Sequence, residues 1–149
     1  MREKAVKGFS IVEIMVALVI IGVLTAMVIP NLLKARIAGN EAAALAGLKA
    51  VYSAVQLYYE KNNAYPESLA DLAQTDSSPA YIDAGITSGS KDGYEFSYSS
   101  AGVGDFSANA GPSVPGRTGN RYFYIDETGT IRVNLESEAG QDDPVLSSS

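Results

Sequence analysis

An apolar run dominates the N-terminal part of this sequence. From Phe9 to Leu33 only Glu13 carries a charge, and residues 14–33 form a charge-free run of 20. Folded as a helix with a rise of about 1.5 Å per residue, that run would span roughly 30 Å, which is the thickness of a bilayer's hydrocarbon core. The pattern therefore predicts a membrane-spanning helix over residues 9–33.

Hydrophobic side chains after residue 33 recur at helical spacing. They form one stripe with steps of three and four residues, made of Leu45, Leu48, Tyr52, Val55 and Tyr59. Alanines over residues 42–50 favour a helix, and Pro66, which follows two asparagines, prevents its continuation. We expect a single helix from Phe9 to about Lys61, apolar on all sides in its first half and amphipathic in its second half.

Four short segments in the second half of the chain alternate between apolar and polar residues, as strands with one buried face do. Two of them lie at residues 94–99 and 106–110. Residues 121–125 and 130–134 flank the turn-forming sequence Asp126-Glu127-Thr128-Gly129, which predicts a hairpin. Because no long crossover separates these strands, we expect them to form an antiparallel sheet.

The segments between these elements are mostly polar. Pro66 is suited to a first helical turn and predicts a short helix over residues 68–73. Residues 74–93, with a turn near Tyr81 and Ile82, and residues 111–120 are rich in glycine and polar residues and predict loops. The polar residues 136–149 predict a disordered tail.

These elements together predict an α+β fold. The amphipathic part of the long N-terminal helix would cover one face of a small antiparallel sheet of about four strands. Residues 34–135 would form a globular domain with one modest core.

The composition excludes many kinds of chemistry. Cysteine and histidine are absent, which excludes disulfides, thiolate nucleophiles and cysteine-ligated zinc and removes the commonest general base. The sequence contains no nucleophile–base pair, phosphate-binding glycine loop or zinc-ligand spacing. We therefore expect neither enzymatic activity nor a cofactor.

Four acidic residues could offer oxygen ligands to calcium: Asp126, Glu127, Asp142 and Asp143. Their spacing matches no known metal loop. We expect the first pair to serve the turn and the second pair to lie in a solvated tail, and we expect no metal site.

Charge is divided along the chain. Residues 1–8 hold three basic residues and one acidic residue, whereas residues 51–149 hold fourteen acidic and five basic ones. Basic residues just before an apolar span stay in the cytoplasm, so the acidic domain would lie on the other side of the membrane. Its negative charge disfavours nucleic acid as a partner, except through a local basic patch.

The N-terminal segment allows three interpretations. A cleaved secretory signal fits the basic start, but the apolar run is long for one and no A-x-A cleavage sequence follows it closely. A plain anchor on a monomeric protein leaves the acid near the start of the span unexplained. The sequence from Lys7 to Glu13, KGFSIVE, with Gly22 and Pro30 in the apolar run after it, resembles the class III signal of type IV pilins and type II secretion pseudopilins.

This resemblance implies the pilin fold and a defined processing. In that family a prepilin peptidase cuts after the glycine, here Gly8, and the new N-terminus, here Phe9, is methylated. Residues 1–8 would be the leader peptide, and residues 9–33 would anchor the protein in the inner membrane before forming the core of a filament. The implied partners are the peptidase and methylase, the lipid bilayer, the inner-membrane assembly platform and other pilin subunits, identical or different.

The function that the resemblance implies is that of a structural subunit. A type IV pilus used for adhesion, twitching motility or DNA uptake is the first interpretation, and the protein would then lie in an extracellular fibre. The alternative is a pseudopilin of a type II secretion system, in a periplasmic pseudopilus. A monomeric membrane-anchored protein is the third.

Glu13 is the candidate assembly residue. After cleavage Phe9 carries a basic amino group, and in a packed filament this amine and the Glu13 carboxylate would both lie among apolar side chains, where unpaired charges are costly. Pairing Glu13 of one subunit with the Phe9 amine of its neighbour removes both costs and fixes the axial register.

Gly22 and Pro30 mark a weak part of the apolar helix. Proline removes a backbone hydrogen bond, glycine lowers helix propensity, and the residues between them are rich in β-branched types. A bilayer would keep this segment helical, because the backbone has no water to bind there. In a filament we expect it to unwind and lengthen the subunit.

Overall fold

The computed structural model describes residues 8–73, 80–100 and 104–146. The chain divides into two compact units, one ending at Ala35 and the other beginning at Arg36. From here on, residues 8–35 are called the stem and the described residues from 36 to 146 are called the head.

A single helix, α1 (Ile11–Asn62), contributes to both units, as the apolar and amphipathic patterns predict. Its buried face lies in the head and includes Leu48 and Val55 of the predicted stripe. The centre of that face is one position earlier in the chain than predicted, however. The buried face also contains residues that the predicted stripe did not include: Glu41, Ala44, Gly47, Val51 and Ala54. Leu45, Tyr52 and Tyr59 lie at its edges and are only partly buried.

Gly47 explains much of this shift. A Cβ atom at this position would lie 2.8 Å from Cζ of Phe96, so only glycine lets the sheet approach the helix this closely. Counting large apolar residues misses such a position, although it lies at the centre of the contact.

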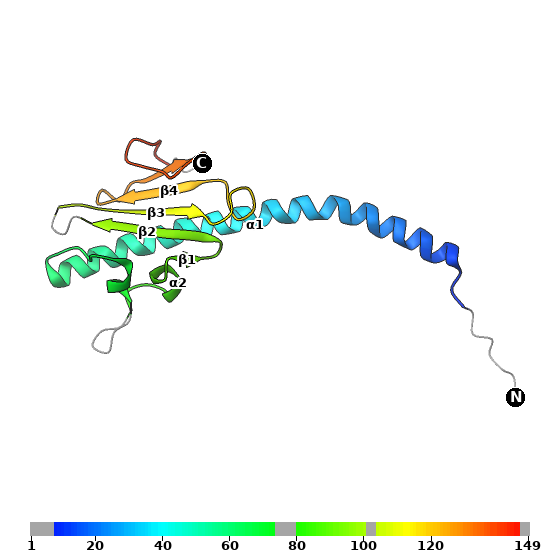
Figure 1. The fold of residues 1–149 in the computed structure, drawn as a ribbon, viewed down its shortest axis with the longest axis horizontal. Helices are drawn as coiled ribbons and strands as arrows, with labels where there is room; N and C mark the ends of the chain where they lie inside the picture. Colours follow the sequence, from blue (N-terminus) through cyan, green and yellow to red (C-terminus); the bar gives the residue numbers. More distant parts are fainter. Residues whose placement is uncertain (1–7, 74–79, 101–103, 147–149) are drawn as a thin grey trace, which may run out of the picture. The chain divides into compact units, whose positions relative to one another are not determined.

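The sheet of the head has five antiparallel strands in the order β1-β2-β3-β4-β5. Figure 1 shows its labelled strands lying beside the part of α1 that belongs to the head. The strands are β1 (Ser90–Lys91), β2 (Tyr94–Ser100), β3 (Phe106–Pro112), β4 (Tyr122–Asp126) and β5 (Ile131–Asn134). The antiparallel sheet and its four longer strands are confirmed, and β1 is an additional strand.

The alternation predicted for the strands is also confirmed. Tyr94 and Phe96 of β2, Phe106 of β3, and Phe123 and Ile125 of β4 are buried against α1 in one core. Glu95 and Ser97, between them on β2, are exposed on the other face of the sheet. The sheet therefore has an apolar inner face and a polar outer face.

The segment predicted as a loop before β2 contains more structure than expected. A 3-10 helix, η1 (Leu69–Leu72), agrees with the short helix predicted there, but α2 (Ala84–Thr87) and β1 were not predicted. Asp83 begins α2 by accepting a hydrogen bond from the amide of Gly85, at 2.8 Å. Elements of two and four residues are too short to produce a recognisable period.

The expectation of a disordered C-terminal tail is wrong for residues 136–146. The Val133 amide donates to the Pro144 carbonyl at 3.0 Å, and the Leu146 amide donates to the Ile131 carbonyl at 2.8 Å. These bonds place residues 144–146 along the edge of β5, so polar composition alone did not prevent ordering. The last three residues of the expected tail lie outside the described residues.

Candidate assembly surfaces

The stem begins with three residues that are not helical. Gly8, Phe9 and Ser10 precede α1, and the Ser10 carbonyl accepts hydrogen bonds from the amides of Glu13 and Ile14, at 3.1 and 3.3 Å. Phe9 has 77% of its surface exposed. The junction at which we expect cleavage therefore precedes the helix on its described side, and Lys7 lies outside the described residues.

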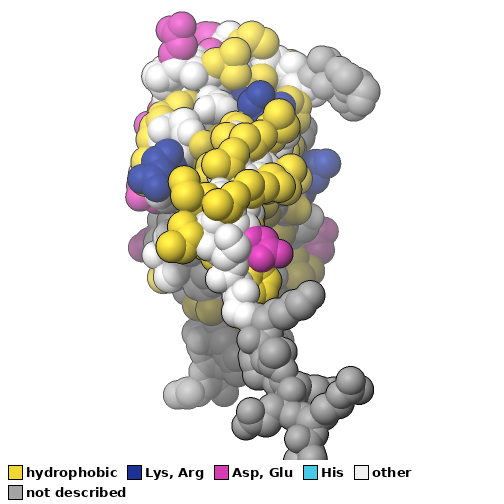
Figure 2. Space-filling model, turned by 90° about the vertical axis from the view of Figure 1, so that its right-hand side faces the viewer, with side chains coloured by type: hydrophobic (Ala, Val, Ile, Leu, Met, Phe, Trp, Pro, Cys, Tyr) yellow, Lys and Arg dark blue, Asp and Glu magenta, His cyan; other side chains and the backbone are white. Residues whose placement is uncertain are grey.

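The stem exposes apolar side chains on all sides. Its large hydrophobic residues from Phe9 to Leu33 are between 42% and 79% exposed, and Figure 2 shows this apolar surface in yellow. By length and composition α1 could cross a membrane, with a mean hydropathy of 2.7 over its most apolar 18 residues. So large an apolar surface requires lipid or other protein around it.

A shallow groove of about 410 Å³ is part of this surface. Val12, Met15, Val16, Val19 and Ile20 line it, all from the first three turns of α1. Because these residues share one face of the helix, beside Glu13, a second apolar helix could pack in the groove close to that carboxylate.

Glu13 lies on the first turn of α1 and its side chain is exposed. Among the residues that the structure describes, its carboxylate has no hydrogen-bond or ion-pair partner. An acid at a helix N-terminus is favoured by the helix dipole, but that interaction is small, about 0.3–1 kcal/mol at an exposed site. A stronger partner for Glu13 would have to come from outside the described residues.

The segment between Gly22 and Pro30 is helical in the structure, because α1 continues through Pro30. The Thr25 hydroxyl donates to the Ile21 carbonyl at 2.7 Å, and the side-chain nitrogen of Asn31 donates to the Met27 carbonyl at 3.2 Å. Pro30 has no N–H, so the Ala26 carbonyl lacks its usual helical donor. A Cβ on Gly22 would meet no atom within 4 Å, so nothing in the stem itself requires glycine at this position.

A second surface of interest lies in the head, where the loop between β3 and β4 is attached to α1. The Glu41 carboxylate accepts a hydrogen bond from the Asn120 amide at 2.9 Å and pairs with Nε of Arg121 at 2.7 Å. The side chain of the preceding residue, Asn40, donates to the Thr118 carbonyl at 2.8 Å.

Tyr94 of β2 also contributes to the attachment of this loop. Its hydroxyl donates to the Arg121 carbonyl at 2.9 Å, and burial together with the nearby Glu41 carboxylate raises the pKa of Tyr94 to about 12. Gly119 must be glycine here, since a Cβ would lie 2.0 Å from the Tyr94 hydroxyl. The loop is therefore fixed to the helix by both polar contacts and packing.

Comparisons with known proteins match the apolar stem to a described sequence motif. Residues 4–29 match the model of the prokaryotic N-terminal methylation motif. The chain is also 34% identical to the type IV wide pilus major component PilA4 of Thermus thermophilus over 90 residues, which are 59% of this chain and 69% of that protein. The chain belongs to the family of type IV pilins and type II secretion pseudopilins.

Other relatives match this pilin-family chain over a shorter length. Type II secretion system core protein G of Aeromonas hydrophila is 33% identical over 66 residues, 44% of this chain and 46% of that protein. Protein G of Escherichia coli is 38% identical over 60 residues, 40% of this chain and 41% of that protein. The chain thus spans less than half of the length of these two relatives.

The acidic residues considered for calcium have other contacts in this pilin-family head. The buried Asp126 carboxylate accepts hydrogen bonds from the amide and the hydroxyl of Thr128, which confirms its role in the turn of the hairpin. Asp143 accepts from the Asn134 side chain at 2.9 Å and from the Gly140 amide at 2.8 Å, so it orders the C-terminal segment instead of lying in a solvated tail. Within the described ranges no group of three potential metal ligands occurs.

The sequence analysis did not identify the pairing of Glu41 with Arg121. A signal was present, because Glu41 is the one charged position in register with Ala44, Leu48, Val51 and Val55 on the buried face. A charge on an apolar helix face predicts a buried partner. The partner itself is 80 residues away in the sequence, and no local pattern could have identified it.

Proposed function

We propose that this pilin-family chain is a structural subunit of a type IV pilus, held in the inner membrane by residues 9–33 until it is assembled. The observation that carries this proposal is the surface of residues 9–33, which is apolar on all sides and contains a single charge, Glu13, without a partner among the described residues. The same chain has a head that forms its own hydrophobic core. The family consists of structural subunits, and nothing in the head suggests a reacting centre.

Transfer of the stem from lipid to a filament brings no hydrophobic gain, because lipid tails are as apolar as leucine side chains. Assembly must therefore be driven by close packing and by polar pairing. Gly22 leaves room for a neighbouring helix to approach. The Glu13 carboxylate supplies the polar half of a pair, and its complement would be the amine of a neighbouring Phe9.

Processing would create that complement. In the unprocessed chain, residue 9 has an uncharged amide nitrogen. Cleavage after Gly8 by a prepilin peptidase turns this nitrogen into an amine with a pKa near 8, and it remains basic when methylated. A subunit would therefore become competent to assemble only after its leader is removed, which prevents premature polymerisation in the membrane.

A pseudopilin of a type II secretion system is the second candidate function, because protein G relatives match 40% and 44% of the chain. The pilus is favoured by the longer match to PilA4, which covers 90 residues or 59% of this chain, against 66 and 60 residues for the two protein G relatives. In either case the head would lie outside the cytoplasm, and an inner-membrane assembly platform would extract the subunit.

Electron microscopy of cells that lack the gene, and of the same cells complemented with variants, tests the proposal. We expect long surface fibres with the wild-type chain and none with Glu13→Ala, although that variant should be inserted and cleaved normally. Glu13→Asp should give intermediate yield, since its carboxylate is one methylene shorter. Ser10→Ala, three residues away and uncharged, is the matched control.

Two outcomes would contradict the proposal. A normal fibre yield with Glu13→Ala would show that the carboxylate is not needed for assembly. A wild-type strain without fibres, in which deletion of the gene stops the export of folded proteins, would favour the pseudopilus.

A further inference from the structure

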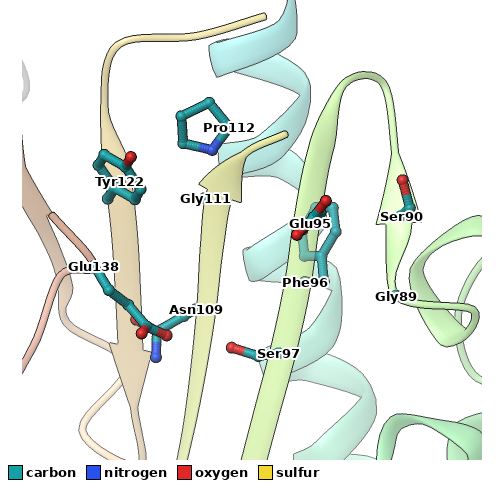
Figure 3. A pocket seen from close by; sticks show the side chains of 10 residues that line it. All are labelled: Gly89, Ser90, Glu95, Phe96, Ser97, Asn109, Gly111, Pro112, Tyr122 and Glu138. Carbon is teal, nitrogen blue, oxygen red and sulfur yellow. The ribbon is translucent and has the colours of Figure 1, made fainter. Parts of the chain in front are cut away.

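The outer face of the sheet contains a hollow of about 470 Å³ at the end where β3 leaves and β4 enters. Figure 3 shows Glu95 on β2, Asn109 on β3, Tyr122 on β4 and Glu138 from the C-terminal segment around it. A Cβ on Gly111 would lie 3.1 Å from the ring of Tyr122, so this glycine allows the ring to lie over the backbone of β3. The hollow is therefore formed by four segments that are far apart in the sequence.

The lining of the hollow offers hydrogen-bond acceptors and few donors. Glu95 and Glu138 contribute carboxylates, and no lysine or arginine lines the hollow. Oδ1 of Asn109 is shielded from water and has no donor among the described residues. The face of an aromatic ring such as that of Tyr122 also attracts cations. This combination suits a guanidinium or ammonium group, which donates several hydrogen bonds and carries positive charge.

The head contains seven basic residues, and most of them already have partners. Lys91 pairs with Asp83, Arg121 pairs with Glu41, Arg132 donates to the Asp143 carbonyl, and Lys61 also has an interaction. The side chains of Arg36, Lys49 and Arg117 have none within the described part of the chain. Arg36 and Lys49 lie on α1, whereas Arg117 is exposed on the loop between β3 and β4.

The loop that carries Arg117 is held in one conformation. The amides of Arg117 and Thr118 both donate to the Val114 carbonyl, at 3.1 and 2.9 Å, and the Gly116 amide donates to the Gly119 carbonyl at 2.9 Å. Its far end is attached to α1 through Glu41, as described above. A fixed loop loses little conformational entropy when its tip binds a partner, so it is well suited to present an arginine to another molecule.

We propose that Arg117 of one subunit inserts into the acidic hollow of a neighbouring subunit, where Glu95 and Glu138 pair with its guanidinium. This inference rests on the proposed function, since it needs copies of the chain brought together by their stems. It adds a contact between heads that has its own partner residues.

The geometry of this contact favours a filament over a closed dimer. The loop and the hollow are different surfaces of the same head, so each subunit can donate its arginine to one neighbour and accept an arginine from another. Such head-to-tail contacts propagate unless a rotation closes them into a ring. The direction of growth would then be set by the heads as well as by the stems.

Charge reversal in full-length chains tests the contact. We expect Arg117→Glu alone and Glu95→Arg alone each to lower the yield of sheared fibres about tenfold, since like charges then face each other across the contact. Co-expression of the two variants should restore most of the yield. The carboxylate introduced by Arg117→Glu then meets the guanidinium introduced by Glu95→Arg, and the unchanged Arg117 meets the unchanged Glu95. Glu67→Arg, an exposed acid of the head away from the hollow, is the matched control.

The absence of cysteine gives a second measurement that does not depend on yield. A chain with Arg117→Cys and Glu95→Cys, treated in assembled fibres with a short bis-maleimide, should give a ladder of covalent oligomers. Either single cysteine variant should give no ladder.

The inference would be overturned by normal fibres from both reversal variants, by a failure of co-expression to restore the yield, or by cross-linked monomers only. A defect in adhesion to a glycan surface with an unchanged fibre yield would assign the hollow to a saccharide instead, and would also overturn it. If the wild-type chain formed no fibres at all, the proposed function would fail first, and this result is distinct from a failure of the contact.

Discussion

The stem and the head use their apolar residues in opposite ways. In the head they turn inward, and Tyr94, Leu48 and Phe123 are fully buried in a core that α1 and the sheet share. In the stem they turn outward, and no large apolar residue there is less than 42% exposed. The head thus buries its own apolar surface, whereas the stem needs lipid or another chain to cover its apolar surface.

This difference shows what can be changed in each part. A substitution in the stem should leave the fold of the head intact and affect only processing or assembly. A substitution in the core of the head should lower its stability in the isolated subunit. The following substitutions and conditions test whether effects on processing and assembly are separate from effects on the stability of the head, beginning with the largest effect.

The largest effect is expected at the processing junction. Gly8→Val should prevent cleavage entirely, because a branched side chain is too bulky for the residue before the scissile bond. Intact mass spectrometry should show a chain that retains its leader, in place of the mature chain of 141 residues with N-methyl-Phe9. Gly22→Ala, which changes a glycine with open space around it, is the control and should be cleaved normally. A mature start at Phe9 in the valine variant would contradict the prediction.

Loss of the Glu41 carboxylate should destabilise the head by about 2–3 kcal/mol. The variant Glu41→Ala leaves the Arg121 guanidinium and the Asn120 amide without their partner, and the cost is below that of a fully buried pair because Arg121 remains 38% exposed. Glu41→Gln should cost less. Urea unfolding of the purified chain in detergent measures both, with the exposed Glu60 changed to alanine as the control. Equal stability of Glu41→Ala and Glu60→Ala would show that the attachment of the loop does not matter.

High pH should destabilise the head and leave the stem unaffected. Burial raises the pKa of both Tyr94 and Tyr98 to about 12. Between pH 10 and pH 12 these phenols are ionised in the unfolded chain but still protonated in the folded one, so the folded state binds more protons and stability falls as pH rises. Each residue should contribute a decrease of about 1.4 kcal/mol per pH unit in that window. Tyr94→Phe should roughly halve the decrease, and an unchanged slope would contradict the assignment.

The smallest effect on the isolated subunit is expected at Pro30. Pro30→Ala restores an N–H that can donate to the Ala26 carbonyl, and it should leave the stability of the head unchanged. In fibres, however, the wild-type segment from Gly22 to Pro30 should be extended in a near-atomic map, and the variant should be more helical there. Continuous helical density through Asn31 in wild-type fibres would show that the weak segment does not unwind.

The sequence predicted the elements whose signals are local. A charge-free run predicts a spanning helix, and the alternation of Tyr94, Phe96 and Tyr98 predicts a half-buried strand, because each pattern is complete within a few turns or residues. The helical stripe was placed one position too late, since small residues such as Gly47 allow the closest approach and carry no hydrophobic signal. The C-terminal segment was missed because its order depends on Asp143 and on the edge of β5, which only the folded sheet provides.

The candidate residues show the same division. Glu13, Gly22 and Pro30 could be selected from the sequence because they interrupt a uniform run, and Gly8 and Phe9 were selected through the resemblance to the prepilin signal. The pairing of Glu41 with Arg121, and the hollow around Asn109, could not, because both join segments that are distant in the chain. Composition predicts which surfaces need a partner outside the chain. Contacts within the head can be identified only when the register of its strands is known.

Residues 144–146 also decide which kind of polymer this chain can form. They cover the backbone groups of β5, and the opposite edge strand, β1, is only two residues long. An uncovered edge is a template for pairing with another strand, and a filament would hold many such edges close to one another. A head lacking this segment would be expected to add sideways to other heads and tangle neighbouring fibres. By covering the edge of β5, the C-terminal segment would thus prevent sheet-edge aggregation and leave growth along the filament axis.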